Sequence, residues 1–105
     1  MKKMPSKAIT SLNLKKNLKR KKVTFSIEAV GAKEVALLGD FNEWNSKAHP
    51  MRHEGNGLWT KSIFIPAGKY EYKFLIDGKW VEDPRNEQTS PNCFGNINSV
   101  LNVNY

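Results

Sequence analysis

The sequence predicts an all-β fold, in which about six or seven short antiparallel strands form a sandwich. Three observations point to this fold class. Apolar and polar residues alternate in several segments, turn residues separate these segments at short intervals, and no segment shows a clear helical period. A small closed barrel would fit the same observations and is the alternative architecture.

The first two strands are expected directly after a basic leader. Val23, Phe25 and Ile27 alternate with polar residues, which is typical of a strand with one buried face. The next segment, Glu34 to Gly39, is short and almost continuously apolar. That pattern indicates a strand in the middle of a sandwich.

The middle of the chain combines a long polar stretch with a third clear strand. Residues 40–57 contain a proline and two glycines, so we expect a loop with one short irregular strand around Met51. Trp59 then shares its parity with two isoleucines in a strand that ends at Pro66-Ala67-Gly68. This parity predicts that Trp59 belongs to the core.

A hairpin is predicted at Asp77-Gly78, the strongest two-residue turn signal in the chain. It would join strands at residues 70–76 and 79–82, and its two-residue loop would pair Leu75 with Trp80. Residues 83–98 are turn-like, and a last strand is expected from Ser99 to Val103. The core side of the first hairpin strand would consist of Tyr70, Tyr72, Phe74 and Ile76.

Two tryptophans are predicted to lie outside the core. Because opposed residues share one side of a sheet, Trp80 falls on the side opposite the core, near Lys73. Trp44 lies in a polar loop without a periodic core partner. Aromatic planes beside amides and an ammonium group suit a sugar chain, whose rings present apolar C–H faces and whose hydroxyls need polar partners. The alternative is that Trp80 packs under a neighbouring loop.

Several ordered sequence blocks between about Val23 and Val103 resemble carbohydrate-binding module family 48. Relatives in this family include the glycogen-binding domain of the AMP-activated protein kinase beta subunit and the N-terminal domains of branching and debranching enzymes. The resemblance implies an immunoglobulin-like, early-set β-sandwich that binds α-1,4-glucans such as glycogen, starch and maltooligosaccharides. The matching blocks are Gly39-Asp40-Phe41-Asn42-Glu43-Trp44, Pro50-Met51, Gly57-Leu58-Trp59, Pro66-Ala67-Gly68, Tyr72 to Trp80, Asp83-Pro84 and Phe94 to Leu101.

The resemblance also implies which residues contact the sugar. Trp44 and Trp80 correspond to tryptophans that stack on glucose units, and Lys73 and Asn98 correspond to residues that bond sugar hydroxyls. These side chains include the three that parity and loop position had already placed outside the core.

Two further positions match the family's site with a changed residue. Phe94 stands where the kinase domains have a leucine that enters the sugar helix, and Asn96 stands where they have a threonine. Many family members attached to enzymes serve as packing domains. A protein-interaction domain that docks on an enzyme of glycogen metabolism is therefore the alternative to a sugar-binding module.

The positive charge of the chain is confined to its first 22 residues. Nine basic and no acidic residues occur there, whereas residues 23–105 carry eight basic and ten acidic ones. We expect residues 1–22 to form a disordered, solvated tail and residues 23–105 to form one domain. The alternative for the tail is an electrostatic arm for nucleic acid or anionic lipid, because clustered cations release counterions from polyphosphates.

No catalytic, metal or cofactor site is expected. His49 and His53 are four residues apart but have a proline between them and no evident third ligand. Cys93 is the only cysteine and lacks a nearby base, so we expect a reduced, cytoplasmic protein without a nucleophilic thiol. The chain of 105 residues has no apolar run that could span a membrane and cannot hold a large enzyme fold, so a free-standing module is expected.

Overall fold

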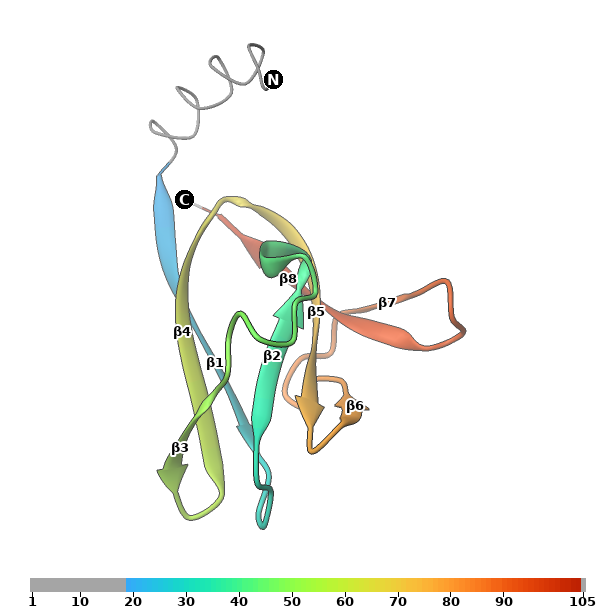
Figure 1. Ribbon diagram of the computed structural model, residues 1–105. Helices are drawn as coiled ribbons and strands as arrows, with labels where there is room; N and C mark the ends of the chain where they lie inside the picture. The colour runs from blue at the N-terminus through green and yellow to red at the C-terminus, as the bar shows by residue number, and fades with distance from the viewer. Residues whose placement is uncertain (1–18, 105) are drawn as a thin grey trace, which may run out of the picture.

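A computed structural model describes residues 19–104, which form two antiparallel sheets (Figure 1). One sheet has the strand order β1-β4-β3 and the other β2-β5-β8-β7, with β6 also paired to β5. The predicted all-β sandwich is confirmed. The strands are β1 (Arg20–Glu28), β2 (Val35–Gly39), β3 (Arg52–Gly55), β4 (Leu58–Pro66), β5 (Gly68–Ile76), β6 (Lys79–Val81), β7 (Thr89–Pro91) and β8 (Ile97–Val103), and a 3-10 turn, η1, spans Asp40–Asn42.

The start of β1 differs from the prediction. The strand begins at Arg20 rather than at Val23, because the long β4 provides partners as far as Pro66. Backbone pairing needs no apolar side chain, and the basic residues at the start of β1 stay exposed. The first 18 residues of the predicted tail, and with them most of the possible electrostatic arm, lie outside the described residues.

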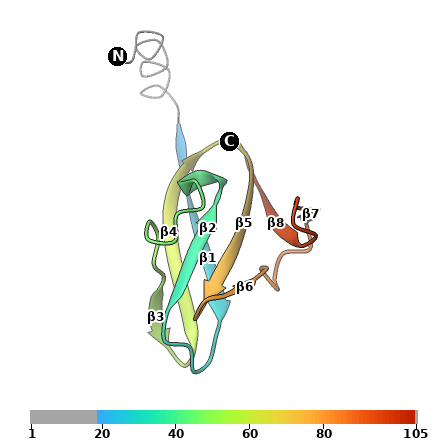
Figure 2. The same cartoon turned by 45° about the vertical axis from the view of Figure 1, so that its right-hand side comes forward.

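The core lies between the two sheets and follows the predicted alternation. Figures 1 and 2 show β1 and β4 beside β2 and β5, and inward-facing residues of these four strands form one cluster. Trp59 is only 7% exposed and belongs to this cluster, as predicted. The main core residues are Phe25, Ile27, Val35, Leu37, Trp59, Ile63, Ile65, Tyr72 and Phe74.

The β5–β6 hairpin has the predicted register, with Leu75 opposite Trp80. Asp77 and Gly78 both adopt left-handed backbone angles, with φ of 48° and 84°. This geometry is typical of a two-residue hairpin turn. The Asp77 carboxylate also accepts hydrogen bonds from the backbone N–H groups of Lys33 and Glu34, which ties the hairpin to the β1–β2 connection.

The segment before β8 is more ordered than the sequence predicted. Its residues Thr89–Pro91 form β7, which pairs with a β8 that begins at Ile97 rather than at Ser99. No sequence pattern indicates β7, because this strand has three residues and no apolar alternation. The β7–β8 hairpin extends away from the sandwich (Figure 1).

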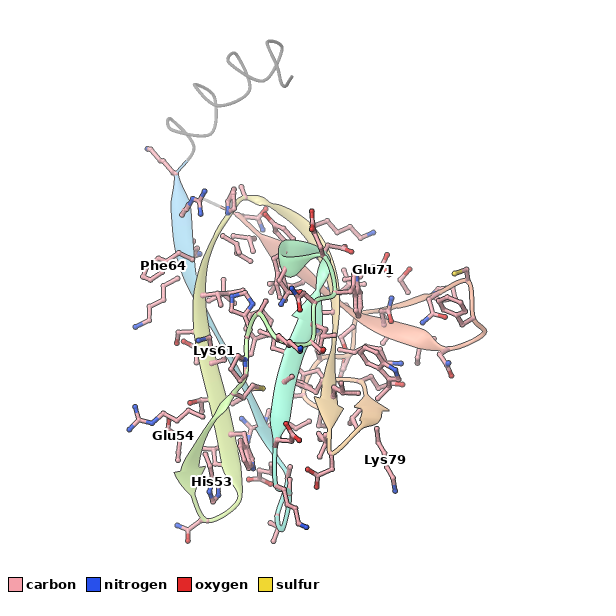
Figure 3. The ribbon with its side chains drawn as sticks, in the orientation of Figure 1. His53, Glu54, Lys61, Phe64, Glu71 and Lys79 are labelled. Atoms are coloured by element: carbon pink, nitrogen blue, oxygen red, sulfur yellow. The ribbon has the colours of Figure 1, made fainter. Side chains whose placement is uncertain are left out.

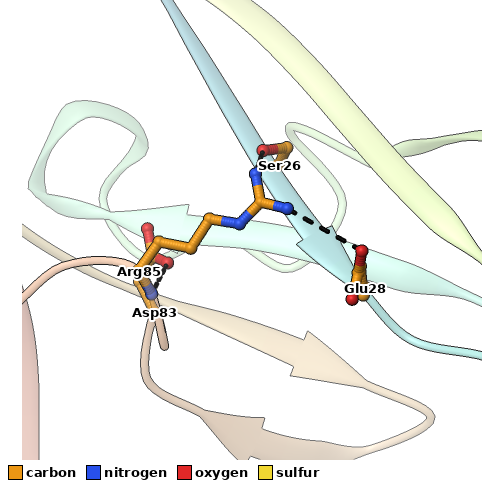
Figure 4. Close-up of polar contacts among 4 residues, drawn as sticks. All are labelled: Ser26, Glu28, Asp83 and Arg85. Carbon is orange, nitrogen blue, oxygen red and sulfur yellow. Dashed lines mark hydrogen bonds and ion pairs between the residues drawn. The ribbon is translucent and has the colours of Figure 1, made fainter.

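A short loop between β6 and β7 fastens the two sheets together. The buried Tyr72 hydroxyl donates a 2.6 Å hydrogen bond to Asp83. Arg85 reaches across to β1, where its guanidinium donates to Ser26 Oγ at 3.2 Å and lies 3.9 Å from the Glu28 carboxylate (Figure 4). Exposed ion pairs contribute little stability. The buried Tyr72–Asp83 bond therefore holds the loop on β5, and the exposed Arg85 contacts link the loop to β1 of the other sheet.

Within residues 19–104, no helix has the length and apolar character that crossing a bilayer requires.

Candidate functional site

A groove of about 490 Å³ lies over the side of β5 that faces away from the core. We call this side the outer face of β5; it carries Glu71, Lys73 and Leu75. All six residues that the sequence analysis assigned to a sugar site line the groove. The complete lining consists of Asp40, Trp44, Glu71, Lys73, Trp80, Asn92, Cys93, Phe94, Asn96 and Asn98.

The two predicted tryptophans are neighbours in this groove. The ring centroids of Trp44 and Trp80 are 6.2 Å apart, and the ring planes are inclined by 62°. Trp80 is 52% exposed, so the alternative in which it packs under a loop is wrong. The two indoles form an angled apolar surface rather than a flat one. Such a surface complements a ligand that curves.

The loop that carries Trp44 has a constrained backbone. Glu43 and Trp44 both have left-handed angles, with φ of 56° and 58°, which is unfavourable for residues with a side chain. Hydrogen bonds offset this cost: the Trp44 backbone N–H donates to Asn42 Oδ1, and its indole N–H donates to Asp40 Oδ1 at 3.1 Å. The second Asp40 oxygen accepts the backbone N–H of Glu71 at 2.8 Å. Asp40 thus fixes the Trp44 ring relative to β5.

His49 supports the same loop through a hydrogen bond with Asn42. The side-chain amide of Asn42 donates to Nδ1 of His49 at 2.8 Å and to the backbone carbonyl of Leu37. Burial, with a smaller contribution from the positive charge of Lys61, lowers the pKa of His49 below its usual value. The neutral ring is therefore favoured, and it is the form whose Nδ1 can accept the Asn42 bond.

The second histidine has a different environment. His53 stacks on Trp59 with ring centroids 4.8 Å apart, and its Nε2 accepts the backbone N–H of Gly57. The two histidines therefore serve separate parts of the fold. Among residues 19–104, no group of three or more His, Cys, Asp or Glu side chains could hold a metal ion.

Lys73 was predicted to line the site, but its environment is unexpected. The residue is only 8% exposed, yet its ammonium makes no hydrogen bond or ion pair with another residue in the described part of the chain. With no protein acceptor bonded to it, the ammonium keeps its three N–H donors available at the groove. Lys73 lines the groove, so a ligand there could supply the missing acceptors.

Amide side chains form the wall of the groove opposite Trp44. Asn98 is 7% exposed, donates to Glu71 Oε1 at 3.0 Å and accepts from Asn92 at 3.2 Å. Asn92 in turn accepts the backbone N–H groups of Phe94 and Asn96, which shapes the tight β7–β8 turn. This turn holds the Phe94 ring 84% exposed at the groove. Figure 3 shows Glu71 on the side of β5 from which the β7–β8 hairpin extends.

The sequence analysis did not assign two acidic residues of the groove to the site: Asp40 and Glu71. Parity could have found Glu71, because it lies two residues before Lys73 on the same face of β5. Asp40 gave no such signal, since its role depends on two hydrogen bonds that only the folded chain creates.

Comparisons with known proteins point to one family. The family described as the glycogen recognition site of AMP-activated protein kinase matches residues 12–105. The chain is 34% identical over 73 residues to the mouse 5'-AMP-activated protein kinase subunit beta-2, and the match covers 70% of this chain and 26% of that protein. It is 38% identical over 73 residues to the pig subunit beta-1, of which 57% is covered.

Two similar proteins are enzymes of other kinds. A 1,4-alpha-glucan branching enzyme of Bradyrhizobium sp. is 48% identical over 58 residues, which cover 53% of this chain and 8% of the enzyme. The crystal structure of a maltogenic amylase from S. marinus matches 82% of this chain and 14% of its own, with a TM-score of 0.64 and 24% identity. The amylase similarity shows the sandwich fold. The chain spans only about a quarter of the mouse kinase subunit.

Proposed function

The chain belongs to the family of the glycogen recognition site of AMP-activated protein kinase, and from this membership we propose that it is a non-catalytic module that binds α-1,4-glucans such as glycogen, starch and maltooligosaccharides. One observation carries the proposal. A buried ammonium group without a protein partner lies in the same groove as two adjacent indoles. This combination offers a sugar both a stacking surface and a hydrogen-bond donor.

Each groove residue has a role in the proposed complex. Trp44 and Trp80 stack on neighbouring glucose rings, and the angle between their planes follows the curvature of an α-1,4 chain. Lys73 donates to sugar hydroxyls. Asn98 uses the amide hydrogen and the carbonyl lone pair that its protein contacts leave free. Phe94 and Asn96 contact the sugar from the β7–β8 turn.

The carboxylates of the groove support a binding role rather than catalysis. A glycosidase needs two carboxyl groups that flank the scissile bond and are available for proton transfer or attack. Asp40 uses both oxygens to hold Trp44 and the Glu71 backbone, and Glu71 holds Asn98. Both side chains are thus occupied in positioning the binding residues.

The expected affinity is weak. Each aromatic contact contributes about 0.5 to 1.5 kcal/mol and each sugar hydrogen bond about 1 kcal/mol. A few such contacts, less the cost of ordering the sugar, correspond to a Kd of roughly 10 µM to 1 mM.

A titration with maltoheptaose, followed by tryptophan fluorescence, tests the proposal. We expect a saturable change that is weakened in Trp44→Ala and in Trp80→Ala. Phe64→Ala is the matched control, because Phe64 is 60% exposed but lies on β4 and does not line the groove. A response that does not saturate by about 5 mM sugar, or that survives both tryptophan variants, would contradict glucan binding.

A second candidate is a domain that docks on a cytoplasmic enzyme of glycogen metabolism. It is favoured by the similarity to a kinase subunit and to a branching enzyme, in both of which the matching segment belongs to a longer chain. The free, exposed thiol of Cys93 suits a reducing compartment. Pull-down from lysate with and without competing glycogen separates the candidates, since a docking domain keeps its protein partner when glycogen is added.

A further inference from the structure

A second hollow of about 530 Å³ adjoins the groove. Lys73, Trp80 and Asn96 line both spaces, so the two adjoin at these side chains. The residues that line only the second hollow are Val81, Glu82, Gly95 and Ile97. None of them was assigned to a site by the sequence analysis.

We propose that the second hollow binds the continuing end of the same glucan, so that the site extends beyond Trp80 and favours longer linear chains. This inference rests on the proposed function. The occupant follows from this adjacency, because a sugar stacked on Trp80 in the groove has its next glucose units beside residues that also line the second hollow.

The chemistry of the second hollow suits a glucose unit. Trp80 is 52% exposed and Ile97 38% exposed, and both offer apolar surface to sugar C–H groups. The Glu82 carboxylate, which makes no hydrogen bond or ion pair with another residue of the described chain, is available to accept bonds from sugar hydroxyls. The Asn96 side-chain amide and the Lys73 ammonium supply donors. Donors, acceptors and an apolar surface are thus all present.

The hollow also has room for a ring. A side-chain carbon placed on Gly95 would meet no atom within 4 Å, so the backbone of the β7–β8 turn borders open space there. Glu82 and Ile97 both line the hollow, one after β6 and one at the start of β8. A sugar between them would contact both the sheet and the turn.

The test compares a closed sugar with a long linear one. β-Cyclodextrin has no chain end that could continue into the second hollow, whereas maltodecaose can fill the groove and the hollow together. The variant is Glu82→Ala combined with Ile97→Ser. Glu87→Ala is the control, because Glu87 is exposed, carries the same charge in the same connection and lines neither space.

In the unmodified chain and in the control, we expect maltodecaose to bind more tightly than β-cyclodextrin. In the double variant, the Kd for maltodecaose should rise about threefold to tenfold, because one or two sugar contacts are lost. The Kd for β-cyclodextrin should stay the same. An unchanged cyclodextrin Kd also shows that the variant is folded. Maltodecaose can bind in several registers, and this lowers its apparent Kd by the same factor in every variant. The effect therefore cancels when the Kd of the double variant is compared with that of the unmodified chain.

An equal preference for maltodecaose in the double variant and the unmodified chain would overturn the extended site while leaving glucan binding intact. Equal weakening for both sugars would also overturn it, because the two residues would then act on the groove itself. Failure of the unmodified chain to bind either sugar would reject the proposed function, and the extension with it.

Discussion

Tyr72 and Lys73 are consecutive buried residues of β5, but only the polar group of Tyr72 has hydrogen-bond partners within the described chain. Tyr72 points into the core, where its hydroxyl donates to Asp83 at 2.6 Å and accepts from Asn86 at 3.1 Å. Lys73 points to the groove, and its ammonium has no hydrogen-bond or ion-pair partner in residues 19–104. The same strand therefore contributes a satisfied polar group on one face and an unsatisfied one on the other.

This difference separates residues that stabilise the fold from residues that the proposed glucan would contact. Burial and the bond to Asp83 raise the pKa of Tyr72 well above its usual value, so the hydroxyl stays protonated and remains a donor. The Lys73 ammonium receives no comparable stabilisation from another residue of the described chain. We therefore expect substitutions on the inner face of β5 to change stability and substitutions on its outer face to change glucan affinity.

Phe74→Ala should show the largest effect on stability. Phe74 is fully buried on the inner face of β5. Its truncation should reduce the free energy of unfolding by about 3 to 5 kcal/mol, through lost burial and the cavity left behind. Urea denaturation measures this change. Trp80→Ala is the comparison from the exposed side and should cost far less, so equal losses in the two variants would contradict the division between the faces.

Lys73→Met should have its effect on binding instead. A charged hydrogen bond is worth about 1.5 to 3 kcal/mol, so the Kd for maltoheptaose should rise by roughly tenfold to a hundredfold. The free energy of unfolding should stay the same or increase, because methionine removes an unsatisfied buried charge at similar volume. Calorimetric titration and urea denaturation of the same samples measure the two quantities.

The control for this substitution is Lys69→Met on the same strand. Lys69 is exposed and lies outside the groove, so its replacement should leave both quantities unchanged. A marked loss of stability in Lys73→Met would show that the ammonium serves the fold, and the contrast with Tyr72 would then be wrong.

The sequence predicted those parts of the site that local geometry decides. The Asp77-Gly78 turn fixes the register of the hairpin, and with it the outward position of Trp80 beside Leu75. Parity likewise placed Lys73 on the outer face of β5. The burial of Lys73, in contrast, depends on loops distant in sequence that close around it, and no pattern within β5 encodes that closure.

The Trp44–Asp40 bond and strand β7 could not be predicted either, because both depend on contacts that form only in the folded chain. The bond from the Trp44 indole to Asp40 needs two consecutive left-handed residues, which the residue types at positions 43 and 44 do not indicate. β7 pairs with β8 across a turn that Asn92 stabilises through its own side chain. Such side-chain-to-backbone bonds are common for asparagine, but their presence at a given position depends on the fold.

Tyr72→Phe should have a smaller effect than Phe74→Ala has on stability or than Lys73→Met has on glucan affinity. It keeps the ring and removes only the hydroxyl, so Asp83 and Asn86 each lose one partner. The free energy of unfolding should fall by about 1 to 2 kcal/mol, and glucan affinity should stay the same because the hydroxyl faces away from the groove. If affinity fell while stability held, the inner face would be part of the binding site after all.

The smallest expected effect concerns His49, a satisfied polar group that lies beneath the groove. Its pKa is lowered by burial and by Lys61, so the folded chain favours the neutral ring. The unfolded chain takes up the proton first as pH falls, and the stabilising contribution of His49 is therefore present above about pH 6.5 and lost below it, as pH falls through the lower pKa of the fold. Protonation also removes the acceptor that Nδ1 offers to Asn42, which holds the Trp44 loop.

Between pH 7.5 and 5.5 we expect the free energy of unfolding to fall by less than about 1 kcal/mol through His49, the net worth of one hydrogen bond. Glucan affinity should weaken slightly with it as the Trp44 loop loosens. His49→Gln keeps an acceptor but does not titrate, so subtracting its urea midpoints from those of the unmodified chain isolates the histidine. If both proteins lose the same stability on acidification, His49 does not carry this pH dependence, and the Asn42 bond matters less to the loop than its 2.8 Å length indicates.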